Sequence, residues 1–148
     1  MINKSIRVKA TASVANVSCG FDCLGFSIKG PSDIIRIEEK KTAGLEIIVT
    51  GKKCNEIPLD PKKNTAGKAL LSFLNEVSEE PKYKIHIEKG IPPGSGLGSS
   101  AASAASSVFG MNTLLDQPLN DHELLIHAME GESAASGSQH ADNVAPVL

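Results

Sequence analysis

The chain has 148 residues, 41% of them hydrophobic and 22% charged, a balance that is typical of a folded globular domain and argues against a disordered or fibrous chain. The net charge of -2 and the lack of a dense run of Lys and Arg argue against a nucleic-acid partner. No stretch has the length of a membrane span, and the first ten residues lack the apolar core of a signal peptide, so we expect a cytoplasmic protein with no membrane association.

The N-terminal part of the sequence has the two-residue alternation of strands with one buried face. Residues 5–11 follow it most clearly, with Ile6 and Val8 between polar neighbours. A loop is predicted over residues 14–20, and further strands over residues 24–28, 33–38 and 45–50. Gly30-Pro31 and Gly44 are typical of turns, and we predict turns there between the strands.

A helical period begins at residue 64. The apolar residues recur at intervals of three and four: Ala66, Ala69, Leu70, Phe73, Leu74 and Val77. Asn64 or Thr65 can cap the start, and Pro81 prevents continuation, so a helix is predicted over residues 64–77. Residues 82–88 return to strict alternation, which predicts a strand that leads directly into a glycine-rich segment.

Two more helices are predicted after that segment. The first starts near Leu97 or Ser99 and ends at Leu115, and its first half contains almost only small residues, so it can lie very near a neighbour or a ligand. The second opens at a capping box and ends near Gly131, followed by a loop over residues 132–138. Strands and helices do not alternate regularly, which favours an α+β fold over a doubly wound parallel sheet.

The glycine-rich segment, residues 91–102, lies between a predicted strand and a predicted helix. Gly94, Gly96 and Gly98 allow the backbone to turn with its N–H groups facing inward, where a Cβ would block a phosphate. The N-terminus of the following helix adds about half a positive charge. The segment therefore predicts an anion-binding loop, although a flexible glycine turn into an ordinary helix would have the same local pattern.

Two common phosphate-binding motifs do not fit this segment. A Walker A loop needs Lys followed by Ser or Thr after its last glycine, whereas Ser99 and Ser100 follow Gly98. A dinucleotide fingerprint needs Gly-x-Gly-x-x-Gly, whereas these glycines are evenly spaced. Neither motif is therefore present in this segment.

Residues 92–102, Pro-x-x-x-Gly-Leu-Gly-Ser-Ser-Ala-Ala, resemble the signature phosphate loop of the GHMP small-molecule kinases, which include galactokinase, homoserine kinase and mevalonate kinase. Two further segments narrow the resemblance to the homoserine kinases. Residues 12–25 resemble the N-terminal motif of these enzymes, and residues 136–146 resemble their substrate motif. The three segments follow the family order and together cover essentially the whole chain.

The resemblance implies an α+β fold like that of the second domain of ribosomal protein S5, with a mixed or antiparallel sheet and helices. Residues 1–148 would form the ATP-binding N-terminal domain, truncated before the family's second glycine-rich motif and C-terminal domain. The implied activity is ATP-dependent phosphorylation of the side-chain hydroxyl of L-homoserine to O-phospho-L-homoserine, in threonine biosynthesis. Relatives are often dimers, so a homodimer is a candidate assembly.

The resemblance also implies a site for ATP and Mg²⁺. The residues implied to bind the nucleotide are Asn64, Pro92, Pro93, Gly94, Ser95, Gly96, Leu97, Gly98, Ser99 and Ser100. Asn64 would help to hold the base, and Ser99 and Glu130 would approach the metal that bridges the phosphates. Taken alone, Asn64 is typical of a helix cap and Glu130 of a solvated carboxylate.

The implied substrate-binding residues are Asn16, Asp22, His140 and Asn143. Asp22 would supply the anion that an α-ammonium group requires, and the amides would orient a hydroxyl toward the γ-phosphate. Asn16, Asp142 and Asn143 are the catalytic candidates, and it stays open whether Asp142 is a general base or orients its neighbours. Without the resemblance, ordinary turn residues would be the favoured interpretation of Asn16, Asp22, His140 and Asn143.

One expected feature of a homoserine site is missing. An α-carboxylate is normally bound by a bidentate Arg, and the chain has only Arg7 and Arg36, both predicted on strands opposite the apolar face. Two alternatives therefore stay open: another GHMP small-molecule kinase, for example of the mevalonate type, or an inactive nucleotide-binding fragment.

Overall fold

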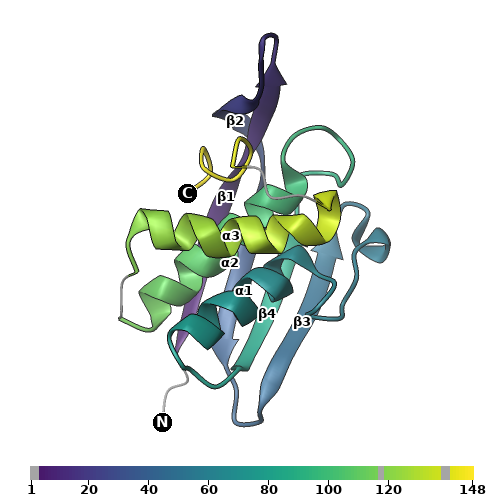
Figure 1. The fold of residues 1–148 in the computed structure, drawn as a ribbon. Coiled ribbons are helices and arrows are strands. Elements are labelled where there is room, and N and C mark those ends of the chain that lie inside the picture. Colours follow the sequence, from purple (N-terminus) through teal and green to yellow (C-terminus); the bar gives the residue numbers. More distant parts are fainter. Residues whose placement is uncertain (1–3, 117–118, 138–140) are drawn as a thin grey trace.

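The computed structural model describes residues 4–116, 119–137 and 141–148. Within them, a sheet is covered on one face by helices, while a hairpin extends past the helices at one end (Figure 1). The strands are β1 (Ser5–Val17), β2 (Gly20–Glu39), β3 (Gly44–Gly51) and β4 (Lys82–Lys89). The helices are the short 3-10 helix η1 (Cys54–Glu56), α1 (Thr65–Glu76), α2 (Ser99–Leu114) and α3 (Asp121–Ser136).

The sheet is mixed, with the strand order β1-β2-β4-β3. β1 pairs with β2 and β2 with β4 in antiparallel fashion, whereas β3 and β4 are parallel neighbours joined through α1. A parallel pair needs a crossover connection, and α1 supplies it. The predicted α+β fold class with a mixed sheet is confirmed.

The first two strands are longer than the alternation predicted. β1 continues to Val17 and β2 begins at Gly20, so the predicted loop over residues 14–20 is mostly strand. The turn predicted at Gly30-Pro31 is also wrong, because β2 passes through it with a register shift opposite Thr11 and Ala12. A proline cannot donate to a sheet ladder, but an irregularity of this kind accommodates it.

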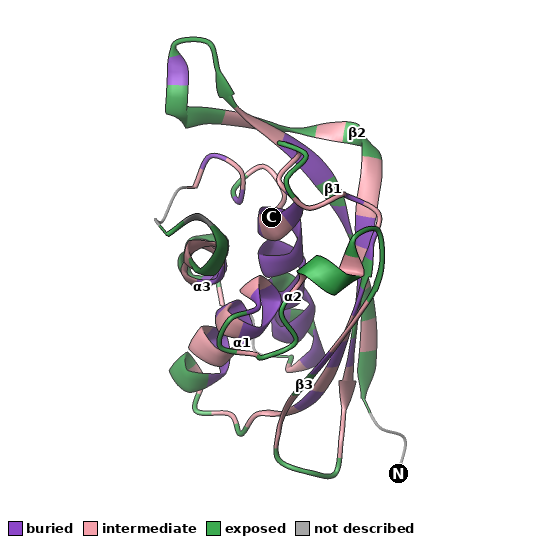
Figure 2. Cartoon of the chain, turned by 90° about the vertical axis from the view of Figure 1, so that its right-hand side faces the viewer, coloured by how far each residue is buried: buried purple, intermediate pink, exposed green. Residues whose placement is uncertain are grey.

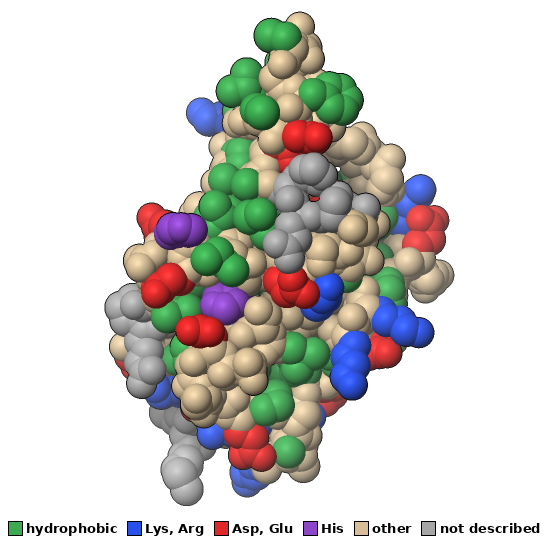
Figure 3. Space-filling view, viewed as in Figure 1, with side chains coloured by type: hydrophobic (Ala, Val, Ile, Leu, Met, Phe, Trp, Pro, Cys, Tyr) green, Lys and Arg blue, Asp and Glu red, His purple; other side chains and the backbone are tan. Residues whose placement is uncertain are grey.

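The tip of the β1–β2 hairpin is apolar and exposed. Phe21 is 66% exposed and Leu24 is 57% exposed, and Phe26 lies beside them on the same strand. Figure 2 shows the hairpin reaching beyond the helices, and Figure 3 shows the hydrophobic side chains gathered over it. The tip therefore adds little to the core of the described chain.

The core lies between the inner face of the sheet and the three α-helices. Ile35, Ile37, Ile85 and Ile87 project from the central strands and are at most 1% exposed. They pack with the apolar face of α1, where Phe73 is fully buried. This is the face that the helical period predicted.

Helix α2 is the central helix and is buried almost throughout, as its small residues allow. Gly110 brings it against β1, because a Cβ there would lie 3.0 Å from Val8 Cγ2. Burial of a helix on most sides requires small side chains where backbones approach closely. The prediction that this helix packs very near its neighbours is confirmed.

Helix α3 begins as predicted and ends later. The Asn120 side chain accepts from the Glu123 amide and the Glu123 carboxylate accepts from the Asn120 amide, so the capping box is confirmed. The predicted end at Gly131 is wrong, because the helix runs to Ser136 and ends at Gly137, which has a left-handed φ of 75°. Gly131 instead allows close packing on α1, since a Cβ there would lie 2.5 Å from the Thr65 carbonyl oxygen.

Among the described residues, no helix is long and apolar enough to cross a membrane.

Candidate functional site

The glycine-rich loop between β4 and α2 opens onto a cavity. Gly94, Gly96 and Gly98 have φ values of 71°, 73° and 63°, all in the left-handed region that glycine adopts without strain. A Cβ added to Gly94 or Gly96 would meet no heavy atom within 4 Å, so the loop faces open space. There is therefore room for an anion beside the loop.

The cavity has a volume of about 450 Å³, which is in the usual range for small-molecule sites. The glycine-rich loop and the start of α2 form one wall, and Ile57, Pro58 and Asn64 form another. The end of α3 contributes Glu132, and Asn16 and Asn143 line the remaining side. Segments far apart in the sequence therefore meet around one space at the N-terminus of a helix.

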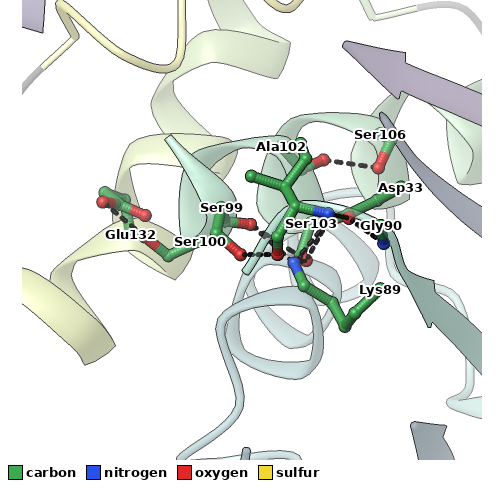
Figure 4. Close-up of polar contacts among 10 residues, drawn as sticks. Asp33, Lys89, Gly90, Ser99, Ser100, Ala102, Ser103, Ser106 and Glu132 are labelled. Carbon is green, nitrogen blue, oxygen red and sulfur yellow. Dashed lines mark hydrogen bonds and ion pairs between the residues drawn. The ribbon is translucent and has the colours of Figure 1, made fainter. Parts of the chain in front are cut away.

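The two serines at the start of α2 have different partners (Figure 4). The Ser99 hydroxyl is buried and donates to the Ile91 carbonyl oxygen at 2.8 Å, which ties the exit of the loop to its entry. The Ser100 hydroxyl donates to Glu132 Oε1 at 2.9 Å. Ser100, and not Ser99, thus directs its side chain toward a carboxylate that lines the cavity.

Glu132 was not among the predicted site residues. Burial raises the pKa of the Glu132 carboxyl and nearby Asp142 adds to that shift, while the Ser100 hydrogen bond and Lys89 oppose it. The sequence analysis predicted a loop from residue 132 onward, so Glu132 was not assigned to a helix face. In the observed helix it lies one turn after buried Ala128, and this spacing places both on the same face.

Glu130 points elsewhere. Its carboxylate lies 3.0 Å from Lys68 Nζ in a half-exposed ion pair between α3 and α1. Among the described residues that line the cavity, the carboxylate from α3 is Glu132 and not Glu130. The predicted metal-binding role of Glu130 therefore receives no support from its position.

An oxygen donor set suited to Mg²⁺ is present at the start of α2. Mg²⁺ prefers oxygen ligands and commonly takes one or two from the protein, with water and phosphate completing its shell. Ser100 Oγ and the Glu132 carboxylate meet this requirement at the cavity wall. No cluster of three or more His, Cys, Asp or Glu occurs in the described part of the chain, so a cage made only of protein ligands is absent there.

Asn64 is buried and lines the cavity, but its side chain makes two contacts within the protein. Its Oδ1 accepts from the Gly67 amide at 3.2 Å and so caps α1, and its Nδ2 donates to the Pro58 carbonyl oxygen at 2.8 Å. The predicted cap is confirmed. The contact with Pro58 fixes the apolar wall of the cavity, so Asn64 shapes this wall through the backbone.

Two of the predicted substrate residues, Asn16 and Asn143, line the cavity. Asn16 lines the cavity, and its Oδ1 accepts from the Asp22 amide at 3.1 Å across the hairpin. The Ser13 hydroxyl donates to Asn143 Oδ1 at 3.1 Å, which places Asn143 against β1 and near Gly98. These contacts bring the N-terminal motif and the substrate motif together.

Asp142 and Asp22 are not among the described residues that line the cavity. Asp142 is 8% exposed, and its carboxylate accepts from the amide of Asn143 at 3.0 Å. A Cβ on Gly25 would overlap the Asp142 carbonyl oxygen, so this glycine lets the segment sit against β2. Asp22 is exposed on the hairpin. His140 lies outside the described residues.

Comparison with known proteins agrees with this architecture. Residues 64–148 match the family model described as the GHMP kinases N terminal domain. A homoserine kinase of Methanococcus vannielii is 41% identical over 98% of this chain and 48% of its own length. A homoserine kinase of Natronomonas pharaonis is 48% identical over 97% of this chain and 46% of its own length.

Solved structures give the same picture. The crystal structure of homoserine kinase from Cytophaga hutchinsonii superposes with a TM-score of 0.91 at 43% identity, covering 99% of this chain and 46% of that one. The Methanococcus jannaschii mevalonate kinase shares the fold, with a TM-score of 0.74 at 21% identity over 96% of this chain and 50% of that one.

The chain spans about half the length of the relatives that it matches, 48% of the Methanococcus vannielii protein and 46% of the Natronomonas pharaonis protein. The family model covers α1, β4, the glycine-rich loop, α2, α3 and the segment around Asn143. With the open glycine loop at the start of a buried helix, this match shows that the chain belongs to the GHMP kinases.

Proposed function

We propose that the cavity binds ATP, with the polyphosphate against the loop of residues 94–100. The observation that carries this proposal is the open face of Gly94 and Gly96 at the N-terminus of α2. Backbone N–H groups and the helix dipole favour an anion there without a basic side chain. The apolar wall around Ile57 and Pro58 suits a planar base.

We propose that Ser100 and Glu132 bind Mg²⁺, in place of the predicted Ser99 and Glu130. The chemistry that Mg²⁺ supplies when bound is neutralisation of charge on the phosphate oxygens. Ser100 and Glu132 are already in hydrogen-bond contact at the cavity wall, whereas the Ser99 hydroxyl is engaged with the Ile91 carbonyl oxygen. Glu130 is engaged with Lys68.

For the protein to which this chain belongs, we propose phosphorylation of the side-chain hydroxyl of L-homoserine, as a step of threonine biosynthesis. Support comes from the names of relatives at 40–48% identity along nearly the whole chain. Asn16 and Asn143 would orient the hydroxyl, and Asp22 and His140 would contact the amino-acid group. Asp142, held behind Asn143, would position that residue.

Among the described residues, no arginine that could bind the substrate carboxylate lines this cavity. Arg7 and Arg36 are exposed on strands, Arg36 lies 3.9 Å from Glu38, and neither lines the cavity in the described part of the chain. For the 148-residue chain alone, we therefore propose the role of an N-terminal ATP-binding domain without turnover. A cytoplasmic location and a homodimer remain predictions.

Two measurements test these proposals separately. Isothermal titration of the chain with ATP and Mg²⁺ should give saturable binding to one site, and no heat of binding at millimolar ATP would refute the nucleotide site. A longer protein that contains this chain should transfer phosphate from ATP to homoserine and not to mevalonate. The opposite preference would replace homoserine with another GHMP kinase substrate.

A further inference from the structure

A buried ion pair lies directly behind the phosphate loop. Asp33 is in β2 and Lys89 is the last residue of β4, and their side chains are 0% and 2% exposed (Figure 4). The Lys89 ammonium donates a hydrogen bond to Asp33 Oδ2. Removing two charges from water costs free energy, and a pair of well-packed apolar residues often stabilises a protein at least as much as a buried ion pair. Stability alone therefore does not explain this pair.

Asp33 holds the entry of the loop. Its second carboxylate oxygen, Oδ1, accepts from the amides of Gly90 at 3.0 Å and Ile91 at 2.9 Å, the two residues that follow β4. A Cβ on Gly90 would overlap the Ser32 carbonyl oxygen, so the chain is pressed against β2 at this point. The direction in which the loop leaves the sheet is thereby fixed.

Lys89 holds the exit of the loop. Its ammonium also donates to the Ser99 carbonyl oxygen at 2.9 Å and to Ser103 Oγ at 2.9 Å, both in the first turns of α2. An ammonium has three N–H donors, and these two contacts together with the hydrogen bond to Asp33 use all three. Burial lowers the pKa of Lys89, and the charge of Asp33 opposes that shift.

We propose that Asp33 and Lys89 are positioning residues that set the distance between the two ends of the phosphate loop, so that its amides are arranged for polyphosphate before the nucleotide binds. The inference rests on the proposed ATP site. Lys89 lines the cavity, whereas Asp33 lies behind it, outside the described lining residues. Both act through the backbone of Gly90, Ile91 and Ser99, and neither needs to touch the ligand.

The alternative is that Lys89 binds a phosphate directly, and the Asp33→Asn variant distinguishes the two. Asparagine has one acceptor oxygen where aspartate has two, so either the Lys89 ammonium or the Gly90 and Ile91 amides lose an acceptor. Positioning predicts weaker ATP binding. Direct contact predicts stronger ATP binding, because the variant releases a cation beside the phosphates.

The experiment measures the dissociation constants of Mg²⁺-ATP and of adenosine for the 148-residue chain. Because only ATP uses the loop, the ratio of the two constants reports loop geometry, and partial unfolding leaves it unchanged. We expect Lys89→Met and Asp33→Asn each to reduce the preference for ATP at least about tenfold. Lys84→Met is the matched control, because this lysine is on the same strand in an exposed pair with Glu46; its ratio should stay within about twofold.

The double variant Asp33→Asn with Lys89→Met removes both charges and protects the test against misfolding of the single variants. It should fold and still show the reduced preference for ATP. A folded double variant with an unchanged ratio, or an Asp33→Asn variant that binds ATP more tightly, would overturn the inference while the ATP site stands. A wild-type chain that binds no ATP would overturn both.

Discussion

The Ser100 hydroxyl donates a hydrogen bond to Glu132 at 2.9 Å, joining the first turn of α2 to the last turns of α3. The contact brings a hydroxyl and a carboxylate together at the N-terminus of a helix, beside the glycine loop. Glu130, two residues earlier, faces Lys68 on α1 instead. Because each helical residue turns the side-chain direction by about 100°, Glu130 and Glu132 point about 200° apart around the axis of α3 and so face different neighbours.

This relationship predicts different effects of two conservative substitutions. Glu132→Gln should reduce the gain in ATP affinity that Mg²⁺ provides by about tenfold or more, since a contact to a charged group contributes about 1.5–3 kcal/mol. Glu130→Gln should leave that gain within about twofold. Titrations with ATP in the presence and absence of Mg²⁺ give the comparison, and the reverse order of effects would return the metal to Glu130.

The glycines of the loop should differ in their tolerance of a side chain. Gly94→Ala places a Cβ in open space and should cost about 1 kcal/mol, the strain of a left-handed φ. Gly98→Ala adds an overlap with Ser13 Oγ, next to Asn143, and should cost at least about 2 kcal/mol. Urea unfolding of both variants measures the difference. Equal losses would mean that Ser13 moves aside freely.

The two helix-capping asparagines provide a second matched pair. Asn120→Ala removes the α3 cap and should lower the free energy of unfolding by about 1 kcal/mol. Asn64→Ala also leaves the Pro58 carbonyl oxygen without its donor, so the loss should be about 2–3 kcal/mol. ATP affinity should fall only for Asn64→Ala, because its contact shapes the cavity wall. An equal decrease in ATP affinity for both variants would mean that general destabilisation, and not the cavity wall, causes the effect.

A buried histidine should make stability depend on pH. Burial lowers the pKa of His127 below its ordinary value, with Glu76 and Glu123 opposing, and its Nδ1 lies 2.9 Å from Ser72 Oγ. At acidic pH the unfolded chain therefore binds more protons than the folded chain at this residue. Its contribution to stability is present above the unfolded pKa of about 6.5 and is lost as the pH falls below it.

Unfolding free energies measured between pH 7.5 and 5 should therefore decrease for the wild type. The decrease should be smaller for His127→Gln. His122→Gln provides the control, because His122 is exposed on the same helix and should leave the wild-type slope unchanged. A slope that His122→Gln removes and His127→Gln preserves would contradict the assignment.

Local periodicity was sufficient for the elements that it describes within one segment. The alternation of residues 82–88 and the helical period of residues 64–77 match β4 and α1 closely, because each pattern needs only one buried face. The pattern failed at Gly30-Pro31 and Gly131. Glycine and proline are typical of turns, but they also occur where backbones pack closely or a strand is irregular, and only the neighbouring elements decide between these uses.

The sequence by itself determined where the glycine-rich loop lies, because three evenly spaced glycines between an alternating strand pattern and a run of small helical residues form a local signal. It could not determine which carboxylate meets Ser100, or that Asp33 and Lys89 hold the loop at both ends. The Ser100–Glu132 contact joins residues that are 32 positions apart in the sequence, and the Asp33–Lys89 contact joins residues that are 56 positions apart. They depend on how β2, β4, α2 and α3 pack, which is the property that a local pattern does not contain.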